Sequence, residues 1–419
     1  MKTFIESFRC AYQSTCRISI CYVAVLPIAA AVQANNGVML FGYGAKAMGM
    51  GGTSIALPQD SAVSANNPAG MARVGNRADM DVTYVRESID TDVGPNHYSD
   101  TVNIFVPTGG YNQVINEDIT LGVSMFGQGV MLDYREPVFG TRAMKSKLEQ
   151  TVIAPTLTWR MAPGHFLGVS PRLAYQKFEF AGMENLGYAS PGPEIAYGAG
   201  FALGYLGELS DRFSVGLAYS SPIWFQKLDR YRDLIPDGLL NMPEIISAGL
   251  AFHLTPTVTL AADYQWIGWA EQGTYGNRMT EGGRPGESDS PGFGWRNQRV
   301  VRIGASWDVD HHWTVRSGAS FASQLVPESE ATFGALAPLM QRDHYTVGTT
   351  YSFDNGVELT GSYIVAPAAT LKGDGPSTGV KVRAESDFVF NLGIGYKFCL
   401  LYTSPSPRDA TLSRMPSSA

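Results

Sequence analysis

Residues 213–220 read Phe-Ser-Val-Gly-Leu-Ala-Tyr-Ser, and large apolar residues alternate there with small ones throughout. Successive side chains of a β-strand point to opposite faces of the sheet, so this period of two predicts a strand. One face would carry only large apolar or aromatic side chains, and the other only Ser, Gly and Ala. Two such different faces are expected where a strand separates lipid from the interior of a membrane barrel.

The same alternation returns along most of the chain after residue 76. We count fourteen such segments, each bounded to within about two to four residues. They lie at 77–86, 101–107, 118–127, 149–160, 165–180, 194–207, 212–222, 244–253, 257–267, 299–308, 312–321, 343–353, 356–366 and 386–398. Tyr, Trp or Phe often stands at a segment end, as in the aromatic girdles of membrane barrels.

The connections between these segments alternate in length. Short ones include 161–164, 208–211, 254–256 and 354–356, and the last contains the Asn-Gly pair typical of a type I′ hairpin. Long ones lie at 87–100, 128–148, 181–193, 223–243, 268–298, 322–342 and 367–385. A soluble β-sandwich has no reason to separate loop lengths in this way, whereas outer-membrane barrels do. We therefore predict an all-β fold, a 14-stranded antiparallel transmembrane β-barrel over residues 77–398.

Composition agrees with a β-rich membrane protein. Of the 419 residues, 16% are charged, 11% are aromatic and 46 are Gly. Only the N-terminus approaches the roughly 20 apolar residues of a spanning helix. The net charge of −7, without a Lys/Arg-rich run, argues against a nucleic-acid partner. The four cysteines are Cys10, Cys16, Cys21 and Cys399, so residues 35–398 hold no disulfide framework, thiolate zinc site or cysteine nucleophile.

The two ends of the chain differ from the rest. Residues 1–34 combine Lys2, Arg9 and Arg17 with an apolar run and a small residue, Ala34, at the expected cleavage position. This pattern predicts a cleaved signal peptide; a membrane anchor is the alternative, which the short apolar run disfavours. Residues 399–419 are rich in Ser and Pro and lack alternation, so we expect a non-native tail.

Residues 35–76 are rich in glycine and small apolar residues that keep no regular period, which favours irregular backbone packed inside another structure. The run from Gly44 to Gly52, then Asp60, then Asn67-Pro68-Ala69, resembles the N-terminal hatch of the FadL family (OmpP1/FadL/TodX). Members of that family are outer-membrane transporters of long-chain fatty acids and other hydrophobic compounds. The resemblance implies that residues 35–76 plug the lumen and that Asn67, Pro68 and Ala69 take part in gating; a merely stable turn is the alternative.

The last predicted strand carries a second resemblance. Its residues Asn391, Gly393, Tyr396 and Phe398 are similar to the C-terminal assembly signal of bacterial outer-membrane barrels. In that signal the Phe usually ends the chain, whereas here 21 residues follow. The resemblance implies recognition by the barrel-assembly machinery and a location in the bacterial outer membrane.

Catalytic motifs are absent from the sequence: there is no G-x-S-x-G elbow, no H-E-x-x-H and no phosphate loop. His311 and His312 stand near Asp308 and Asp310, but adjacent strand side chains point to opposite faces. A solvated turn is therefore favoured over a metal site. We predict no catalytic residue, no metal and no cofactor.

The connection 223–243 is unusually apolar for a loop that faces water. Trp224, Leu228, Tyr231 and Ile235 recur with helical spacing, and Phe225 stands beside them. This spacing predicts a helix with an exposed apolar stripe that captures a hydrophobic ligand. The alternative is a helix that packs over the barrel mouth.

Three arginines, Arg172, Arg302 and Arg316, fall on faces assigned to the lumen. Each is a candidate partner for the carboxylate of a bound fatty acid. The alternative is an ion pair with a carboxylate on another strand, with Asp263, Asp308 and Glu358 as candidates.

The family resemblance implies passive uptake of long-chain fatty acids or similar hydrophobic molecules by a monomer surrounded by outer-membrane lipid and lipopolysaccharide. The family mechanism adds a wall opening at a kinked third strand, and Gly122 and Gly127 in segment 118–127 would permit a kink. One alternative is an uptake channel for aromatic hydrocarbons or alkanes with the same architecture. Another is an outer-membrane barrel with an enzymatic or surface-interaction role.

The expected ends of the mature chain are open to a direct test. Intact-mass measurement of the natural protein should give a chain that begins after Ala34 and ends at Phe398. Peptides from residues 399–419 in that material would contradict the interpretation of the tail.

Overall fold

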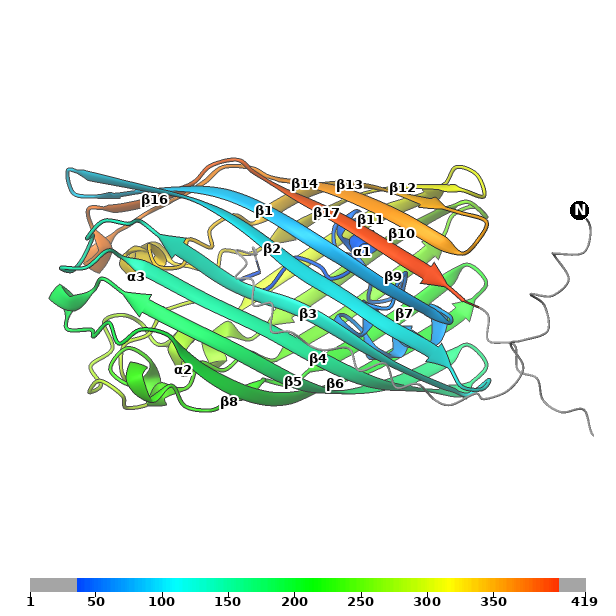
Figure 1. Ribbon diagram of the computed structural model, residues 1–419, viewed down its shortest axis with the longest axis horizontal. Helices are drawn as coiled ribbons and strands as arrows, with labels where there is room; N and C mark the ends of the chain where they lie inside the picture. Colours follow the sequence, from blue (N-terminus) through cyan, green and yellow to red (C-terminus); the bar gives the residue numbers. More distant parts are fainter. Residues whose placement is uncertain (1–35, 399–419) are drawn as a thin grey trace, which may run out of the picture.

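The computed structural model describes residues 36–398, and the strands from β1 onward form one closed antiparallel sheet (Figure 1). The predicted signal peptide and tail lie outside the described residues. The strands are β1 (Arg77–Val93), β2 (Asn96–Val114), β3 (Ile119–Asp133), β4 (Lys145–Ala162), β5 (His165–Ala181), β6 (Glu194–Ser210), β7 (Phe213–Ser220), β8 (Trp224–Phe225), β9 (Ile245–His253), β10 (Val258–Ile267), β11 (Gln298–Asp308), β12 (Trp313–Ala322), β13 (Asp343–Ser352), β14 (Val357–Ala366), β15 (Ala369–Lys372), β16 (Val380–Ala384) and β17 (Asp387–Lys397).

Helices are short and lie in the connections or in the N-terminal segment. The α-helices are α1 (Ala45–Met48), α2 (Gly273–Gly276) and α3 (Ala331–Gly334). The 3-10 turns are η1 (Val63–Ala65), η2 (Pro68–Arg73), η3 (Glu184–Leu186), η4 (Asp229–Tyr231), η5 (Pro236–Gly238), η6 (Trp269–Glu271), η7 (Glu328–Glu330) and η8 (Gly375–Ser377). No helix among residues 36–398 is long and apolar enough to cross a membrane.

Fourteen strands make the wall of the barrel. The two residues of β8 belong to a loop, β15 prolongs β14, and β16 leads into β17 after a two-residue interruption. β1 pairs with β2 on one side and with β17 on the other, which closes the sheet. The predicted 14-stranded antiparallel barrel is confirmed.

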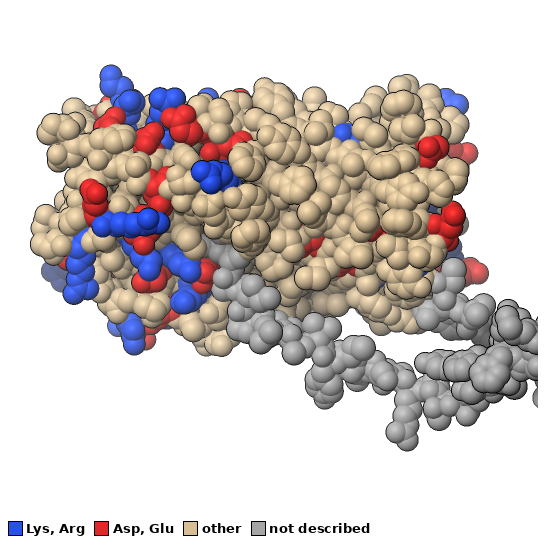
Figure 2. Space-filling model, turned by 45° about the horizontal axis from the view of Figure 1, so that its top comes forward, with Lys and Arg blue, Asp and Glu red and all other residues tan. Residues whose placement is uncertain are grey.

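The period of two in the sequence separates the two faces of the wall. Outward side chains such as Leu217, Val301 and Leu392 are 45–56% exposed, whereas Ala218 and Ser247 on the inner face are buried. Figure 2 shows charged side chains gathered at the end that carries the long loops, and a broad belt nearly free of charge beyond them. This belt is the surface expected to meet lipid.

Two predicted loops are shorter than expected. β1 and β2 continue through most of 87–100 and leave only Gly94 and Pro95 as a turn, and β3 and β4 likewise extend into 128–148. The connection 367–385 also carries β15 and β16. These extensions project beyond the apolar belt, where the outer face of a strand meets water. Their outward residues are therefore polar, and in the sequence they resemble the residues of loops.

The lipid-facing assignment predicts the effect of a charge at Leu217. An Arg at the bilayer midplane of such a barrel costs about 2–4 kcal/mol, and near an interface about 0–1 kcal/mol. Leu217→Arg should therefore destabilise the barrel much more than Leu209→Arg beside the short turn after β6. Denaturant unfolding in lipid vesicles measures both, and equal costs would contradict the assignment.

Candidate functional site

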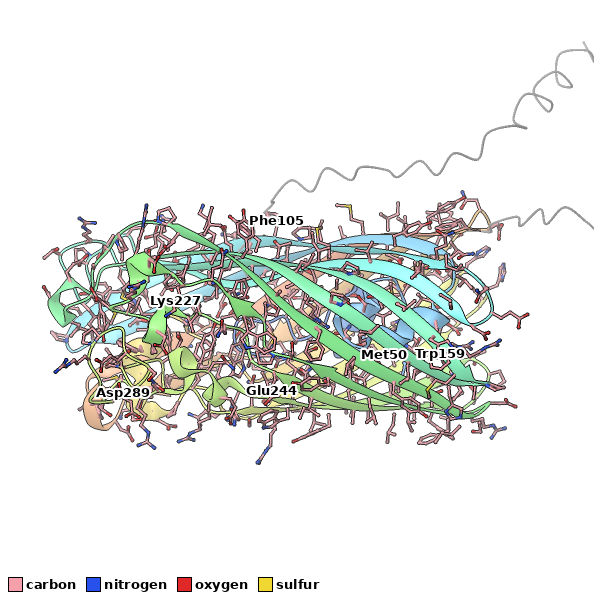
Figure 3. All side chains as sticks on the ribbon, turned by 90° about the horizontal axis from the view of Figure 1, so that it is seen from below. Met50, Phe105, Trp159, Lys227, Glu244 and Asp289 are labelled. Atoms are coloured by element: carbon pink, nitrogen blue, oxygen red, sulfur yellow. The ribbon has the colours of Figure 1, made fainter. Side chains whose placement is uncertain are left out.

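The luminal segment, residues 36–76, occupies the inside of the barrel toward the end with the short turns (Figure 1). Most of its residues are buried, including polar ones such as Thr53, Ser61 and Asn67. Figure 3 shows Met50 of this segment within the barrel, whereas Phe105 lies on the outer surface. The segment touches the wall all around the lumen, and its contacts with the wall are unusually close.

Those contacts depend on glycines of the inner wall. A Cβ at these positions would stand 3.0 Å or less from an atom of the luminal segment, so a side chain there would collide with the segment. The glycines are Gly110, Gly122, Gly168, Gly204, Gly216, Gly249, Gly304, Gly318, Gly348 and Gly393, on ten different strands. We call this set the glycine seat. It allows backbone of the segment to lie directly against backbone of the wall at eight of these positions, and at Gly122 and Gly393 it makes room for the side chains of Met71 and Ala45.

Asn67, Pro68 and Ala69 fit into one part of this seat. The Asn67 Oδ1 accepts from the Ala69 backbone N–H at 3.1 Å and so caps η2. The Asn67 Nδ2 donates to Ile55 O at 2.7 Å and to Tyr205 O of β6 at 3.0 Å. The turn is therefore bonded both to its own segment and to the wall.

An ionic cluster joins the segment to the wall near the short-turn end. The Lys46 Nζ lies 2.6 Å from the Glu358 Oε2 of β14, and the Arg77 Nη2 lies 2.8 Å from the same oxygen. Arg77 also pairs with Asp79, whose Oδ2 accepts from the backbone N–H and hydroxyl of Ser61 at 2.9 and 2.7 Å. Breaking one member of such a buried set leaves another charge uncompensated.

Burial shifts the pKa values of two side chains of the luminal segment near this cluster. It lowers the pKa of Lys46 to about 8, and the charge of Arg77 acts in the same direction. It raises the pKa of Asp60 to about 6, with the charge of Asp79 adding to the effect. Both shifts disfavour the charged form, as expected for groups removed from water.

The three predicted arginines are all buried, and they lie at different places around the lumen. The Arg316 Nε donates to the Gln59 Oε1 of the luminal segment at 2.8 Å, and its Nη1 donates to the Thr350 Oγ1. The Arg302 Nη2 donates to the Gln265 Oε1 at 3.0 Å. The structure does not bring the three together into one site.

Arg172 has the most distinctive surroundings of the three. Its Nη2 donates to Ser64 O at 3.2 Å and to Ala65 O at 3.1 Å, and its guanidinium lies 5.3 Å from the centre of the Phe126 ring. The side chain is buried, and its Nε has no hydrogen-bond partner among residues 36–398. No described carboxylate forms an ion pair with it, and the neighbouring Tyr43 hydroxyl is neutral because burial raises its pKa.

Arg172 borders a cavity of about 30 Å³ between the luminal segment and the wall. The apolar lining comes from three parts of the chain and includes Met39, Phe126 and Ile223. Gln128 also lines it and accepts from the Tyr43 hydroxyl at 2.7 Å. The cavity thus combines apolar walls with one buried cation.

The wall is interrupted beside this cavity. The ladder between β2 and β3 runs only from Val114↔Thr120 to Thr108↔Phe126, whereas β3 stays paired with β4 up to Asp133↔Lys145. Pro107 of β2 has no N–H to continue the ladder. The Gly129 N–H instead donates to Val38 O of the luminal segment at 2.8 Å, with φ 153° at Gly129. The break begins at Gly127, directly after the last paired residue, Phe126. Gly122, in contrast, belongs to the part of β3 that is paired with β2.

The predicted helix in 223–243 is wrong. The connection forms β8 and the turns η4 and η5 instead, with Asp237 at φ 55°. The stripe is not exposed either: Leu228, Tyr231 and Ile235 are at most 1% exposed, Phe225 is buried, and only Trp224 faces outward. Tyr231 packs on Phe178 and donates from its hydroxyl to Gly192 O. The buried residues of this connection instead pack over the barrel mouth, as in the alternative given by the sequence, although without a helix.

The residues of the C-terminal signal divide between the two faces of β17. The Asn391 Nδ2 donates to the Asp81 Oδ1 and the Thr83 Oγ1, both at 2.7 Å, inside the barrel. Gly393 belongs to the glycine seat. Tyr396 is exposed on the outer face, and the ring of Phe398 stacks on Tyr111 with centroids 5.7 Å apart.

His311 and His312 lie in the short connection before β12, and the His312 Nδ1 contacts Ser352 O at 2.8 Å. Within the described part of the chain, no group of three or more His, Cys, Asp or Glu side chains is placed to hold a metal ion.

Several residues that matter here were not predicted from sequence. No local sequence pattern marks Lys46 and Arg77 as an ionic cluster, because their partner Glu358 lies about 300 residues away in the chain. The glycines of the seat were visible as small residues on one strand face. Their alternation with large residues indicated an inner face, but not that backbone would lie against it.

The glycine seat makes a testable prediction at Gly204. A Cβ there would lie 2.1 Å from the Asn67 Oδ1 and 2.8 Å from the Ala69 N. Gly204→Ala should cost about 1–3 kcal/mol, as overpacking does, and should speed amide hydrogen exchange over residues 60–72. Gly361→Ala is the matched control, because its nearest neighbour would be the Leu392 Cδ2 at 3.7 Å. Equal exchange in the two variants would contradict the seat.

Comparison with solved structures shows the same fold. A Pseudomonas aeruginosa FadL homologue has a TM-score of 0.66 and 17% identity over 87% of this chain and 100% of its own. The Pseudomonas putida toluene transporter TodX has a TM-score of 0.63 and 16% identity over 86% of this chain and 100% of its own. The Ralstonia pickettii toluene transporter TbuX has a TM-score of 0.61 and 15% identity over 86% of this chain and 99% of its own.

No curated protein matches the chain in sequence. The family model described as "Outer membrane protein transport protein (OMPP1/FadL/TodX)" matches residues 20–398. That match covers the barrel and the luminal segment together. The chain therefore belongs to the OMPP1/FadL/TodX family of outer-membrane transport proteins for hydrophobic compounds.

Proposed function

We propose that this protein takes up long-chain fatty acids passively across the outer membrane and that Arg172 receives their carboxylate. The observation that carries this proposal is a buried guanidinium with a free Nε and no described anionic partner. Removing a cation from water without a counter-ion is costly. A ligand carboxylate would supply the missing charge through charge-assisted hydrogen bonds.

The apolar walls around Arg172 suit the chain of such a ligand. At about 30 Å³ the cavity is closed to a ligand of this size, so binding requires movement of a lining element. Met39 lines the cavity next to Val38, whose carbonyl accepts from Gly129 at the break in the wall. We propose that residues 36–41 move on binding and that the ligand leaves sideways between β2 and β3.

In the same mechanism, residues 35–76 act as the hatch. The bonds of Asn67 to Ile55 and to Tyr205 support a role for Asn67, Pro68 and Ala69 in holding this hatch closed. The connection 223–243 would receive the ligand first at Trp224, the member of the predicted stripe that is exposed. Phe225, Leu228, Tyr231 and Ile235 would act as its buried support.

Other parts of the proposal rest on the sequence. Residues 1–34 would be removed as a signal peptide, and the signal that ends at Phe398 would be read by the barrel-assembly machinery. The protein would act without a catalytic step.

Uptake of aromatic hydrocarbons is the second candidate function. Trp269, Tyr275, Phe293, Trp295 and Phe333 form a continuous cluster toward the long-loop end, with ring centroids 4.8–6.4 Å apart, and all but the half-buried Phe293 are buried. Aromatic rings favour such offset or edge-to-face neighbours. An uncharged aromatic ligand would make use of this cluster and would not need Arg172.

Binding of oleate and toluene to the detergent-folded protein separates the two functions. Losing charge-assisted hydrogen bonds of about 1.5–3 kcal/mol should weaken oleate binding roughly 10–100-fold in Arg172→Met, while toluene binding stays unchanged. Arg172→Lys should retain part of the oleate affinity, because the charge remains.

Arg160→Met is the control, since Arg160 pairs with Glu117 and Asp118 at the short-turn end. If Arg172→Met loses affinity for oleate and for toluene to the same extent, the substitution has damaged the luminal segment and has not specifically removed carboxylate binding. Oleate binding that toluene displaces, and that Arg172→Met leaves intact, would favour the hydrocarbon function.

A further inference from the structure

The N-terminal end of the luminal segment, residues 36–41, is held from two sides of the lumen. On one side, the Gly129 N–H of β3 donates to Val38 O at 2.8 Å. On the other side, Gly37 packs against Trp269, which lies two residues beyond the end of β10. β3 and β10 lie far apart around the barrel. One anchor therefore belongs to a strand of the wall, and the other belongs to a long connection.

The contact between Gly37 and Trp269 is backbone against an aromatic ring. Gly37 has φ 70°, and a Cβ there would overlap the indole at Cζ2 and Cε2, so glycine provides both the conformation and the space. Trp269 is fully buried, and its Nε1 has no hydrogen-bond partner among residues 36–398. A buried Trp N–H usually finds a partner. Packing therefore positions this indole, and it can move without breaking a hydrogen bond.

Other rings of the long connections hold Trp269 in place. Tyr275 and Trp295 meet it edge to face, with centroids 4.8 and 5.1 Å away, and they stack on each other at 4.8 Å. The Trp295 N–H also donates to Tyr275 O at 2.6 Å. Phe293 extends the cluster to Phe333 of α3, at the end of the barrel where α2 and α3 lie (Figure 1). The position of Trp269 thus depends on the arrangement of these connections.

The two residues after Gly37 lead to the candidate site. Val38 O accepts from Gly129 at the break between β2 and β3, and Met39 lines the cavity beside Arg172. Consecutive Cα atoms are only about 3.8 Å apart, so a shift of Gly37 also moves its neighbours. A continuous series of contacts therefore runs from the aromatic cluster to the break and to the cavity.

We infer that Trp269 is a positioning residue for transport. Its indole holds residues 36–41 in the closed arrangement, and an apolar molecule that enters among the rings at the long-loop end would displace it. Val38 would then release the Gly129 N–H, and Met39 would clear the cavity. The inference rests on the proposed function in one respect, that movement of residues 36–41 admits the ligand.

Hydrogen exchange at the Gly129 amide tests the inference on the full-length protein in detergent, without ligand. Trp269→Leu should speed this exchange roughly 2–10-fold, the factor that an aromatic contact contributes, because Val38 O then protects the amide for less of the time. Phe293→Leu is the matched control: it removes a ring from the same cluster, but the three atoms nearest to a Cβ at Gly37 all belong to Trp269. Equal acceleration in the two variants, or none in Trp269→Leu, would overturn the inference.

A second pair of variants approaches the contact from the other side and serves also if Trp269→Leu does not fold. Gly37→Ala would push the segment away from the indole and should speed exchange at Gly129 as well. Gly75→Ala carries the same backbone strain, with φ 73°, but its Cβ would have no atom within 4 Å, so exchange should stay as in wild type. The same exchange rate in both variants would contradict the role of Trp269.

Oleate binding to the same variants separates this inference from the proposed function. Trp269→Leu should bind oleate roughly 2–10-fold more tightly, because a larger fraction of the molecules has the cavity open. Faster exchange at Gly129 with unchanged oleate affinity would refute the coupling to the cavity. Faster exchange with no oleate binding by wild type or variant would refute the proposed function and leave the positioning of residues 36–41 by Trp269 in place.

Discussion

Direct contact between backbone of residues 36–76 and backbone of the wall is the constraint on which the interior depends. Ile55 O, Ser61 O and Ala69 N all lie where the Cβ of a wall residue would stand, at Gly216, Gly110 and Gly168. Such contact excludes water without large side chains and holds the segment directly against the wall. It also requires glycine at many separate positions, because one added methyl group would push the segment away.

This close fit determines where polar groups of the interior find partners. The segment has little regular secondary structure, so its backbone needs acceptors and donors from the wall. Asp263 accepts from the Ser54 and Ile55 N–H groups, and Arg172 donates to two carbonyls of η1. The ionic cluster around Glu358 adds strength at the short-turn end. If it opens as proposed, the hatch is expected to do so by local movement of residues 36–41, not by leaving the barrel as a rigid body.

The wall is continuous toward the short-turn end and interrupted toward the long-loop end. β1, β2, β15 and β16 extend together toward the long loops, and their outer faces become polar, as at Thr101, Lys381 and Arg383. On one side this extension is separated from β3, and on the other from β13. Breaks of this kind leave side chains in contact where ladder hydrogen bonds stop. The proposed sideways exit of the ligand between β2 and β3 uses the first of these breaks.

The sequence by itself determined the barrel, because the alternation of lipid-facing and lumen-facing residues is a local property that each strand carries alone. It also indicated, through Gly44 to Gly52 and Asn67-Pro68-Ala69, the segment that lies inside. Tertiary structure decided the rest: Lys46 meets Glu358 across 312 residues, and Arg172 packs on the Phe126 ring with a free Nε. The helical spacing in 223–243 was misleading for the same reason, since burial of Leu228, Tyr231 and Ile235 comes from neighbouring loops and strands that no local pattern records.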